Sequence, residues 1–287
     1  MKNALIFGHG YSAAALTRRL VAEGWSITGT TRSRPDAVAA AGAVPLIWPG
    51  ADATEALARA DAVLISTAPG PDGDPVIAAL RPALLAARPK WVGYLSTTVV
   101  YGDHGGDWVT EQTPLESTSS RGLARIAAER EWQALADTAG WPLHIFRLAG
   151  IYGPGRSALD KLRAGKSRRI IKPGQIFSRI HVEDIGQALA ASITQGGPGR
   201  VWNLCDDLPC PPQEVIEYAA ARAGLPLPPA EDYATAPMTP MARSFYSDSK
   251  RVSNAAIKSG LNLRLIFPTY RDGLEPLFQG ATEQQPV

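Results

Sequence analysis

The 287-residue chain carries 29 Lys and Arg residues against 27 Asp and Glu residues, which gives a formal net charge of +2 at pH 7. This near balance excludes the strongly basic surface that is typical of nucleic-acid binding. The two cysteines, Cys205 and Cys210, have neither metal-site spacing nor the number that a disulfide framework needs. No signal region precedes the first apolar run, and no run could span a bilayer. We therefore expect a cytoplasmic protein with reduced thiols and no metal, whose partners include neither nucleic acid nor a membrane.

Short apolar runs alternate with alanine-rich, helix-compatible segments in the first half of the chain. Parallel strands need long crossover connections, so this alternation indicates a parallel sheet with helices on both faces. We predict the α/β class, as a doubly wound parallel sheet. The expected strands are residues 4–7, 25–30, 44–47, 62–66, 91–95 and 143–147, and the clearest helices are residues 11–23, 74–87 and 119–139.

The first predicted strand breaks directly into a G-x-G-x-x-A motif that opens a predicted helix. In this spacing the first glycine permits a tight turn, the second lets backbone N–H groups approach a pyrophosphate, and the alanine lets helix and strand pack closely. The amino end of a helix also attracts anions. The motif thus predicts a Rossmann-like, dinucleotide-binding lobe over residues 1–150, and the alternative is a purely structural turn. The residues expected to bind the dinucleotide here are Gly8, Gly10, Tyr11, Ser12 and Ala13.

The end of the second predicted strand bears on the choice of coenzyme. A site for NAD usually has Asp or Glu at this point, to accept hydrogen bonds from the ribose 2′-hydroxyl. This chain has no acid there and offers Thr30, Arg32, Ser33 and Arg34, which are donors suited to a 2′-phosphate. We therefore expect NADP rather than NAD, the alternative being that the arginines only solvate a surface loop. The coenzyme site is also expected to include Ser66, Thr67 and Ala68, after the fourth strand.

Five later segments resemble, in order, the extended short-chain dehydrogenases/reductases, the group that holds nucleotide-sugar epimerases and dehydratases. They are the Ser/Thr-rich segment 95–103 ending in V-Y-G, the E-x-x-P-L loop 111–115, the R-x-x-x-x-Y-G-P-G segment 147–155, the H-V-x-D helix start in 179–184 and the W-N strand 201–204. The resemblance implies an NAD(P)-dependent enzyme acting on a small molecule, such as a sugar or nucleotide-sugar. It also implies a smaller substrate lobe over residues 151–287, with residues 176–204 returning to the core.

The resemblance implies a catalytic Ser or Thr together with a Tyr-x-x-x-Lys pair on one helix. Thr97, with Thr98 beside it, occupies the Ser/Thr position, where a hydroxyl hydrogen-bonds the reacting oxygen; alternatively these hydroxyls only terminate a strand. Arg121 stands at the Tyr position and Arg125 at the Lys position. Arginine stays protonated, so it cannot be the general base that oxidation of an alcohol needs. Tyr-dependent chemistry is therefore not expected in its usual form.

Four residues apart on one helix, Arg121 and Arg125 are expected to share a face toward the nicotinamide. They would stabilise a developing oxyanion or hold a carboxylate or phosphate of a ligand; the alternative is a solvated or ribose-contacting role. Tyr101 is a candidate substitute proton donor, although packing of a loop aromatic also explains it. We regard the Tyr-x-x-x-Lys spacing at 246–250 as a coincidence, because it lies far beyond the sixth strand.

The carboxyl-terminal third is expected to bind substrate through Tyr152, Arg156 and Arg179. Residues 152–175 are rich in Lys and Arg, which suits a phosphate-bearing ligand or, equally, a solvated face. Proline-rich segments at 209–212 and 226–240 are expected to bend over the cleft. The predicted helix 119–139 is a candidate homodimer contact.

Three functions therefore remain. The first is an NADP-dependent epimerase, dehydratase or reductase acting on a sugar-like or anionic carbonyl compound, with Thr97 polarising the oxygen. The second is a non-catalytic NADP-binding sensor or regulatory protein, which the absence of the family Tyr favours. The third is a structural role in which the nucleotide only stabilises the fold.

Overall fold

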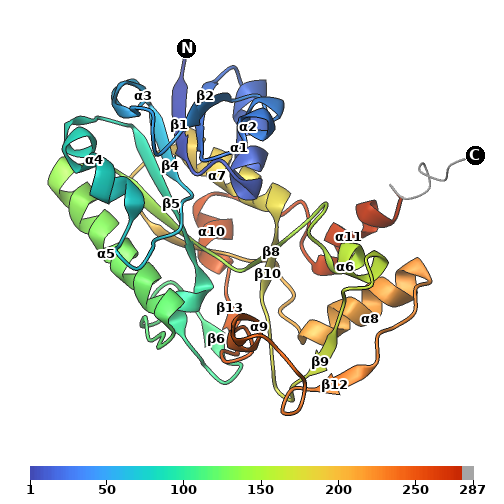
Figure 1. Cartoon of the computed structure of the whole chain (residues 1–287). Helices are drawn as coiled ribbons and strands as arrows, with labels where there is room; N and C mark the ends of the chain where they lie inside the picture. The colour runs from blue at the N-terminus through green and yellow to red at the C-terminus, as the bar shows by residue number, and fades with distance from the viewer. Residues whose placement is uncertain (280–287) are drawn as a thin grey trace, which may run out of the picture.

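A seven-stranded parallel sheet forms the larger of two lobes in the computed structural model, which describes residues 1–279 (Figure 1). The strand order is β11-β7-β5-β4-β1-β2-β3. The bounds are β1 Asn3–Phe7, β2 Ser26–Thr31, β3 Val44–Ile47, β4 Ala62–Ile65, β5 Trp91–Thr97, β7 Leu143–Leu148 and β11 Val201–Leu204. The predicted α/β class and doubly wound parallel sheet are confirmed. The central strands β4 and β7 are buried along their whole length, which explains their continuous apolar runs.

Helices cover both faces of this sheet. One face packs against α1 (Tyr11–Ala22), α2 (Pro35–Ala40) and α7 (Val182–Gln195). The opposite face packs against α3 (Thr54–Ala58), α4 (Pro75–Ala86) and α5 (Ser120–Ala139). The α1 and α7 helices approach closely, since a Cβ on Gly186 would lie 3.0 Å from Cβ of Ala15. Small residues at this crossing therefore hold α7 against the helix that carries the glycine motif.

Helix α5 illustrates how the sequence sets the limits of an element. Ser119 precedes it, and its hydroxyl accepts a hydrogen bond from the Gly122 N–H at 3.1 Å, which caps the first turn. Gly140 ends the helix with φ of 73°, a left-handed conformation that glycine adopts without a Cβ penalty. The helix therefore spans the segment predicted from its alanine-rich sequence.

After β7 the chain leaves the sheet and returns to it twice. Strand β8 (Gly150–Tyr152) pairs in parallel with β10 (Arg179–His181) between the lobes, and α7 and β11 then rejoin the larger lobe. Helix α10 (Ala255–Gly260) also packs, through Ile257, into the core on the face of the sheet that α1, α2 and α7 cover. The larger lobe is thus built from separate stretches of the chain, which include α7 and β11.

The second lobe has its own small core. Helices α6 (Ala158–Arg163), α8 (Pro212–Ala223) and α11 (Tyr270–Gln279) surround it, beside the paired strands β9 (Arg169–Ile171) and β12 (Ala230–Asp232). The lobes are also joined by residues 245–252, which we call the strap. The strap follows the short helix α9 (Pro240–Ser244) and ends in β13 (Arg251–Val252), paired with β6 (Trp108–Val109). No helix within residues 1–279 is long and apolar enough to cross a membrane.

Candidate functional site

The turn between β1 and α1 depends on two glycines for different reasons. Gly8 has φ of 81°, and a Cβ there would lie 3.0 Å from both Cγ2 and the backbone N of Thr67, so this turn needs glycine. Gly10 has extended backbone angles, and a Cβ there would meet nothing closer than the Gly8 carbonyl oxygen at 3.9 Å. The space above Gly10 is therefore open, although its backbone angles do not require glycine.

The amino end of α1 is suited to an anion. No side chain caps it with a hydrogen bond, and its first turn carries no acid. Ala13 is fully buried against the sheet, as the close packing of helix and strand requires. Thr67, two residues beyond the end of β4, has a buried hydroxyl with no hydrogen-bond partner among residues 1–279. A bare helix end beside an unpartnered hydroxyl fits the phosphates of a dinucleotide.

Thr30 has a different role from the one expected. Its side chain is only 1 % exposed, and Oγ1 accepts a hydrogen bond from the Gly8 N–H at 2.8 Å. The Thr30 side chain therefore stabilises the glycine turn by this hydrogen bond, and because it is buried it cannot reach a 2′-phosphate. Arg32, Ser33 and Arg34 follow it on the exposed edge after β2. Ser66 and Thr67 are half-buried and Ala68 is exposed, all after β4 and next to the Gly8 turn.

The hydroxyls expected to be catalytic lie where β5 ends. Thr97 is half-buried, and its Oγ1 accepts a weak hydrogen bond from the Val99 N–H at 3.3 Å, at the start of the short helix η1 (Thr98–Tyr101). Thr98 is 9 % exposed. Thr97 is thus the more accessible of the two, and its proton is free to be donated elsewhere.

Arg121 and Arg125 lie on the same side of α5, but they differ in their contacts. Arg125 is half-buried and donates from Nη1 to the Leu95 carbonyl at 2.8 Å and the Tyr94 hydroxyl at 3.0 Å. Arg121 is exposed, and its guanidinium lies 5.6 Å from the centre of the Phe245 ring on the strap. Partial desolvation and then the nearby charge of Arg125 lower the pKa of Arg121. Neither arginine pairs with a carboxylate among residues 1–279.

The path of α5 places Arg121 near Thr97. Because α5 connects the parallel strands β5 and β7, it runs back along β5 in the opposite direction. Arg121 precedes Arg125 by about one helical turn, or about 6 Å of rise. Thr97 lies two strand residues beyond Leu95, or about 6.6 Å. The amino end of α5, which carries Arg121, therefore lies toward the carboxyl end of β5, where α5 also contacts η1.

Tyr101 is buried in a polar network and is not a free proton donor. It is fully buried, donates from Oη to Asn203 Oδ1 at 2.6 Å and accepts from Arg147 Nη1 at 3.0 Å. Burial raises its pKa, although Arg147 acts in the opposite direction. With its hydroxyl thus engaged, Tyr101 does not fit the role of a proton donor to a ligand, and packing with internal hydrogen bonds explains it.

The same network contains a buried ion pair that the sequence did not reveal. Arg147 Nη2 lies 2.8 Å from Glu129 Oε2, with side chains 6 % and 4 % exposed, and Ser96 also donates to Glu129. Glu129 lies in the middle of α5, and Arg147 begins the R-x-x-x-x-Y-G-P-G segment. The network ties β5, α5, β7 and β11 together directly behind Thr97.

The three residues expected to bind substrate lie in three different settings. Tyr152 is only 8 % exposed, and its hydroxyl donates to the Thr269 carbonyl at 3.3 Å. It therefore belongs to the core of the second lobe and does not face a cleft. Arg179 donates to the Phe177 carbonyl at 3.1 Å and the Cys210 sulfur at 3.2 Å, which stabilises that lobe. Arg156 is exposed and lies over Tyr11.

Part of the basic run at 152–175 is neutralised within the second lobe. Arg168 pairs with Glu231, and Arg169 Nη1 lies 3.0 Å from Glu217 Oε1. Lys172 donates to the backbone carbonyl of Tyr246. These pairs favour a structural role for the run over a broad phosphate-binding surface.

The Tyr-x-x-x-Lys spacing at 246–250 lies in the strap. The Tyr246 ring packs 5.5 Å from the Phe177 ring, whereas Lys250 is buried and donates to the Gly102 carbonyl. The two side chains serve separate contacts, consistent with a coincidental motif. Among residues 1–279, no group of three or more His, Cys, Asp or Glu side chains is placed to hold a metal ion.

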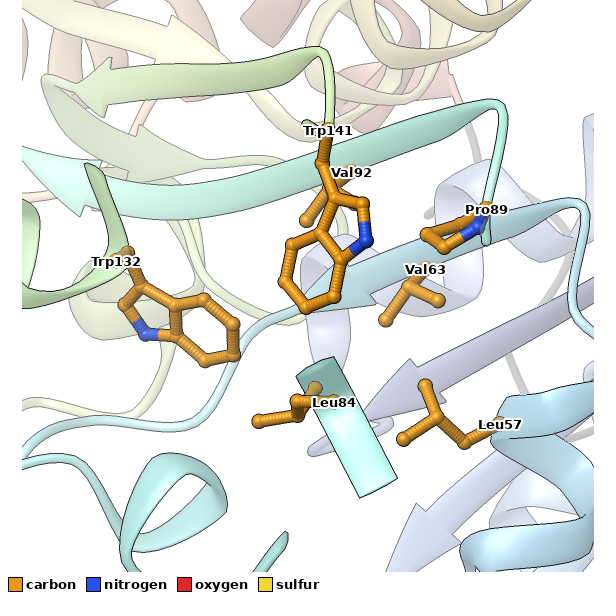
Figure 2. Close-up of a pocket in the computed structure, with 7 residues that line it drawn as sticks. All are labelled: Leu57, Val63, Leu84, Pro89, Val92, Trp132 and Trp141. Atoms are coloured by element: carbon orange, nitrogen blue, oxygen red, sulfur yellow. The ribbon is translucent and has the colours of Figure 1, made fainter. Parts of the chain in front are cut away.

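An apolar space between the sheet and α4 and α5 is part of the core. Figure 2 shows the Trp132 and Trp141 indoles directed into it, and it is too small to admit a water molecule. Its lining residues are Leu57, Val63, Leu84, Pro89, Val92, Trp132 and Trp141. This space lies away from the glycine turn and offers no polar group to a ligand.

The chain is similar to known proteins in sequence and in fold. The model of the NAD dependent epimerase/dehydratase family matches residues 76–205. Protein YeeZ of Escherichia coli (strain K12) is 31% identical over 221 residues, which cover 71% of this chain and 78% of YeeZ.

Three solved structures cover nearly the whole chain. A functionally unknown conserved protein from Silicibacter pomeroyi DSS is 56% identical with a TM-score of 0.93, over 98% of this chain and 99% of that one. A Methylobacillus flagellatus protein, proposed to be an NAD-dependent epimerase/dehydratase, is 27% identical with a TM-score of 0.70, over 98% and 99%. UDP-glucuronic acid 4-epimerase from Bacillus cereus, in complex with NAD, is 16% identical with a TM-score of 0.78 over 96% of each chain, and shares the fold. The chain thus belongs to the NAD dependent epimerase/dehydratase family.

Proposed function

We propose that the protein is an NADP(H)-dependent enzyme of the epimerase, dehydratase or reductase kind, acting on a sugar-like or anionic carbonyl compound. The observation that carries this proposal is the uncapped amino end of α1 beneath the open space at Gly10. Family membership supports a dinucleotide there, and the carboxyl end of β5, with Thr97 and Arg121, lies along the same edge of the sheet.

The coenzyme would be held mainly by backbone groups. The N–H groups of Tyr11 and Ser12, in the first turn of α1, would donate to the pyrophosphate, and Thr67 would supply its unpartnered hydroxyl. When bound, the coenzyme supplies or accepts hydride at its nicotinamide ring. The protein's share is to orient the ring and the substrate at the end of β5.

Arg32, Ser33 and Arg34 support a preference for a 2′-phosphate. These side chains are exposed after β2, and the first acid that follows is Asp36 on α2. Replacing both arginines with alanine is expected to weaken NADPH binding about 30-fold, because two charge-assisted contacts are lost. Fluorescence titration should show NADH binding unchanged within about twofold. If the unmodified protein binds NADH as tightly as NADPH, the proposed preference is wrong.

Thr97 and the two arginines would serve reduction better than oxidation. Thr97 would donate a hydrogen bond to the carbonyl oxygen, and the arginines would stabilise the negative charge that develops on that oxygen as hydride arrives at carbon. Because arginine keeps its proton, the proton that completes the alcohol would come from water, to which Arg121 is exposed. The two unpaired cations would equally hold a carboxylate of the substrate.

Arg121→Gln is expected to lower kcat/KM for NADPH-dependent reduction of an anionic carbonyl compound about 100-fold, because one fixed cation is lost beside the reacting oxygen. Coenzyme affinity should not change. The rate is measured by the loss of NADPH absorbance with a panel of aldehydes, ketones and keto acids. Arg130→Gln, at an exposed position of the same helix, is the matched control. An Arg121→Gln protein with undiminished turnover would remove Arg121 from the site.

Arginine at the position of the family tyrosine also favours a second function, that of a non-catalytic NADP sensor. A sensor would bind NADPH without consuming it with any compound of the panel, and the nucleotide would change its binding to a partner. Cys205 and Cys210 are free cysteines, which supports a cytoplasmic location for the protein. A homodimer through α5, where Leu123 is 53% exposed, stays a prediction.

A further inference from the structure

The loop after β8 carries Arg156 at the end of a tight turn. Residues Gly153 to Arg156 form a tight turn, closed by a hydrogen bond from the Arg156 N–H to the Gly153 carbonyl at 3.0 Å. Pro154 and Gly155, with φ of 71° at the glycine, have the residue types and backbone expected of a type II turn. The next residue, Ser157, forms a capping box with Asp160 at the start of α6. Arg156 is therefore fixed at its backbone on both sides.

This turn is attached to the glycine motif through Tyr11. The Tyr11 hydroxyl donates to the Pro154 carbonyl at 3.0 Å, across 143 positions of sequence. A Cβ on Gly153 would lie 2.6 Å from that hydroxyl, so glycine at this position permits the contact. The guanidinium carbon of Arg156 lies 6.0 Å from the centre of the Tyr11 ring. Tyr11 is the first residue of α1, so the guanidinium lies near the helix end at which the dinucleotide would bind.

The acids near Tyr11 are already engaged by other groups. Asp160 is held in its capping box by Ser157, and Glu183 forms an ion pair with Arg18 at 2.6 Å. Arg156 has no carboxylate within ion-pair distance among residues 1–279. Burial raises the pKa of Tyr11, and the nearby charge of Arg156 opposes that rise. Its charge is therefore available to an anion that arrives at the end of α1.

We infer that Arg156 binds the pyrophosphate of the coenzyme, from the side opposite the N–H groups of α1, and that Tyr11 positions it. The inference rests on the proposed coenzyme site and deepens it. Arg156 would act not as the substrate ligand expected from sequence but as a coenzyme ligand supplied by the second lobe. A guanidinium matches the paired oxygens of a diphosphate well. Coenzyme binding would then draw the two lobes together at this turn.

The test compares two ligands by isothermal titration calorimetry. NADPH contains the pyrophosphate, whereas 2′-AMP has the adenosine end and the 2′-phosphate but no pyrophosphate. Arg156→Gln is expected to weaken NADPH binding about 10-fold and to leave 2′-AMP binding unchanged within twofold. Tyr11→Phe, which removes the hydrogen bond to Pro154 but keeps the ring, should weaken NADPH binding two- to threefold, by our estimate from the value of one such bond.

Arg163→Gln, which removes the same charge from the exposed end of α6, is the matched control and should bind both ligands normally. Equal NADPH affinity in the Arg156→Gln and unmodified proteins would overturn the inference, as would an equal loss for both ligands. The thermal unfolding midpoint of each variant shows that it is folded. If the unmodified protein binds neither NADPH nor 2′-AMP, the proposed coenzyme site itself is wrong. If only the Arg156 inference is wrong, the unmodified and Arg156→Gln proteins both bind NADPH with the same Kd.

Discussion

Replacing Glu129 with alanine is expected to lower the free energy of unfolding by about 3–5 kcal/mol. Arg147, only 6 % exposed at its side chain, would then lose its one carboxylate partner while it stays buried. Ser96 would also lose its acceptor. Equilibrium denaturation in urea, followed by tryptophan fluorescence, measures the change. A loss below about 1 kcal/mol would mean that the buried charge finds water or another partner.

A double variant separates the effect of an unpaired buried charge on stability from the effect of lost side-chain volume. Replacing Glu129 with leucine and Arg147 with methionine together removes both charges and keeps most of the volume. This protein should recover most of the stability that the single alanine variant loses, because no unpaired charge stays buried. Its Tyr101 hydroxyl would still have Asn203 as its acceptor.

The second large effect is expected at Gly10, where valine should weaken coenzyme binding at least about 100-fold. The branched side chain would occupy the space through which the pyrophosphate approaches the backbone. The backbone of Gly10 is extended, with φ of −113° and ψ of −157°, and an added Cβ would meet the Gly8 carbonyl oxygen no closer than 3.9 Å. The fold should therefore tolerate the change. Calorimetric titration with NADPH measures the binding.

Two further observations decide the meaning of that result. Gly10→Ala should show a smaller loss than Gly10→Val, since it adds one carbon to the same space. The unfolding midpoint of both proteins should stay within a few degrees of the original. If Gly10→Val binds NADPH normally, the turn between β1 and α1 is structural, and the coenzyme proposal is wrong.

The strands and long helices could be predicted from the sequence because each carries its own signal. Continuous apolar runs mark the buried strands, and the Ser119 and Gly140 caps mark α5. The same local signals say nothing about which side of a strand a polar residue faces. Thr30 illustrates this: it is the next-to-last residue of β2, close to exposed donors, yet its hydroxyl turns inward to Gly8.

Contacts between distant segments could not be predicted in the same way. The hydrogen bond from Tyr101 to Asn203 joins residues 102 positions apart, and that from Lys250 to Gly102 joins residues 148 positions apart. The R-x-x-x-x-Y-G-P-G segment was recognised as a motif, but the pairing of its Arg147 with Glu129 depends on how α5 lies on the sheet. The sequence of the strap shows neither helical nor strand periodicity, so its position between the lobes could not be predicted.

The late return of α7 and β11 to the sheet has a consequence for the nascent chain. While the ribosome is still adding residues before 182, the apolar stripe of α1 has no helix to meet, and β7 is an open edge until β11 pairs with it. The turn between β1 and α1 is thus synthesised well before the elements that pack against it. Chaperones that shield exposed apolar surface would act on this polypeptide during that interval.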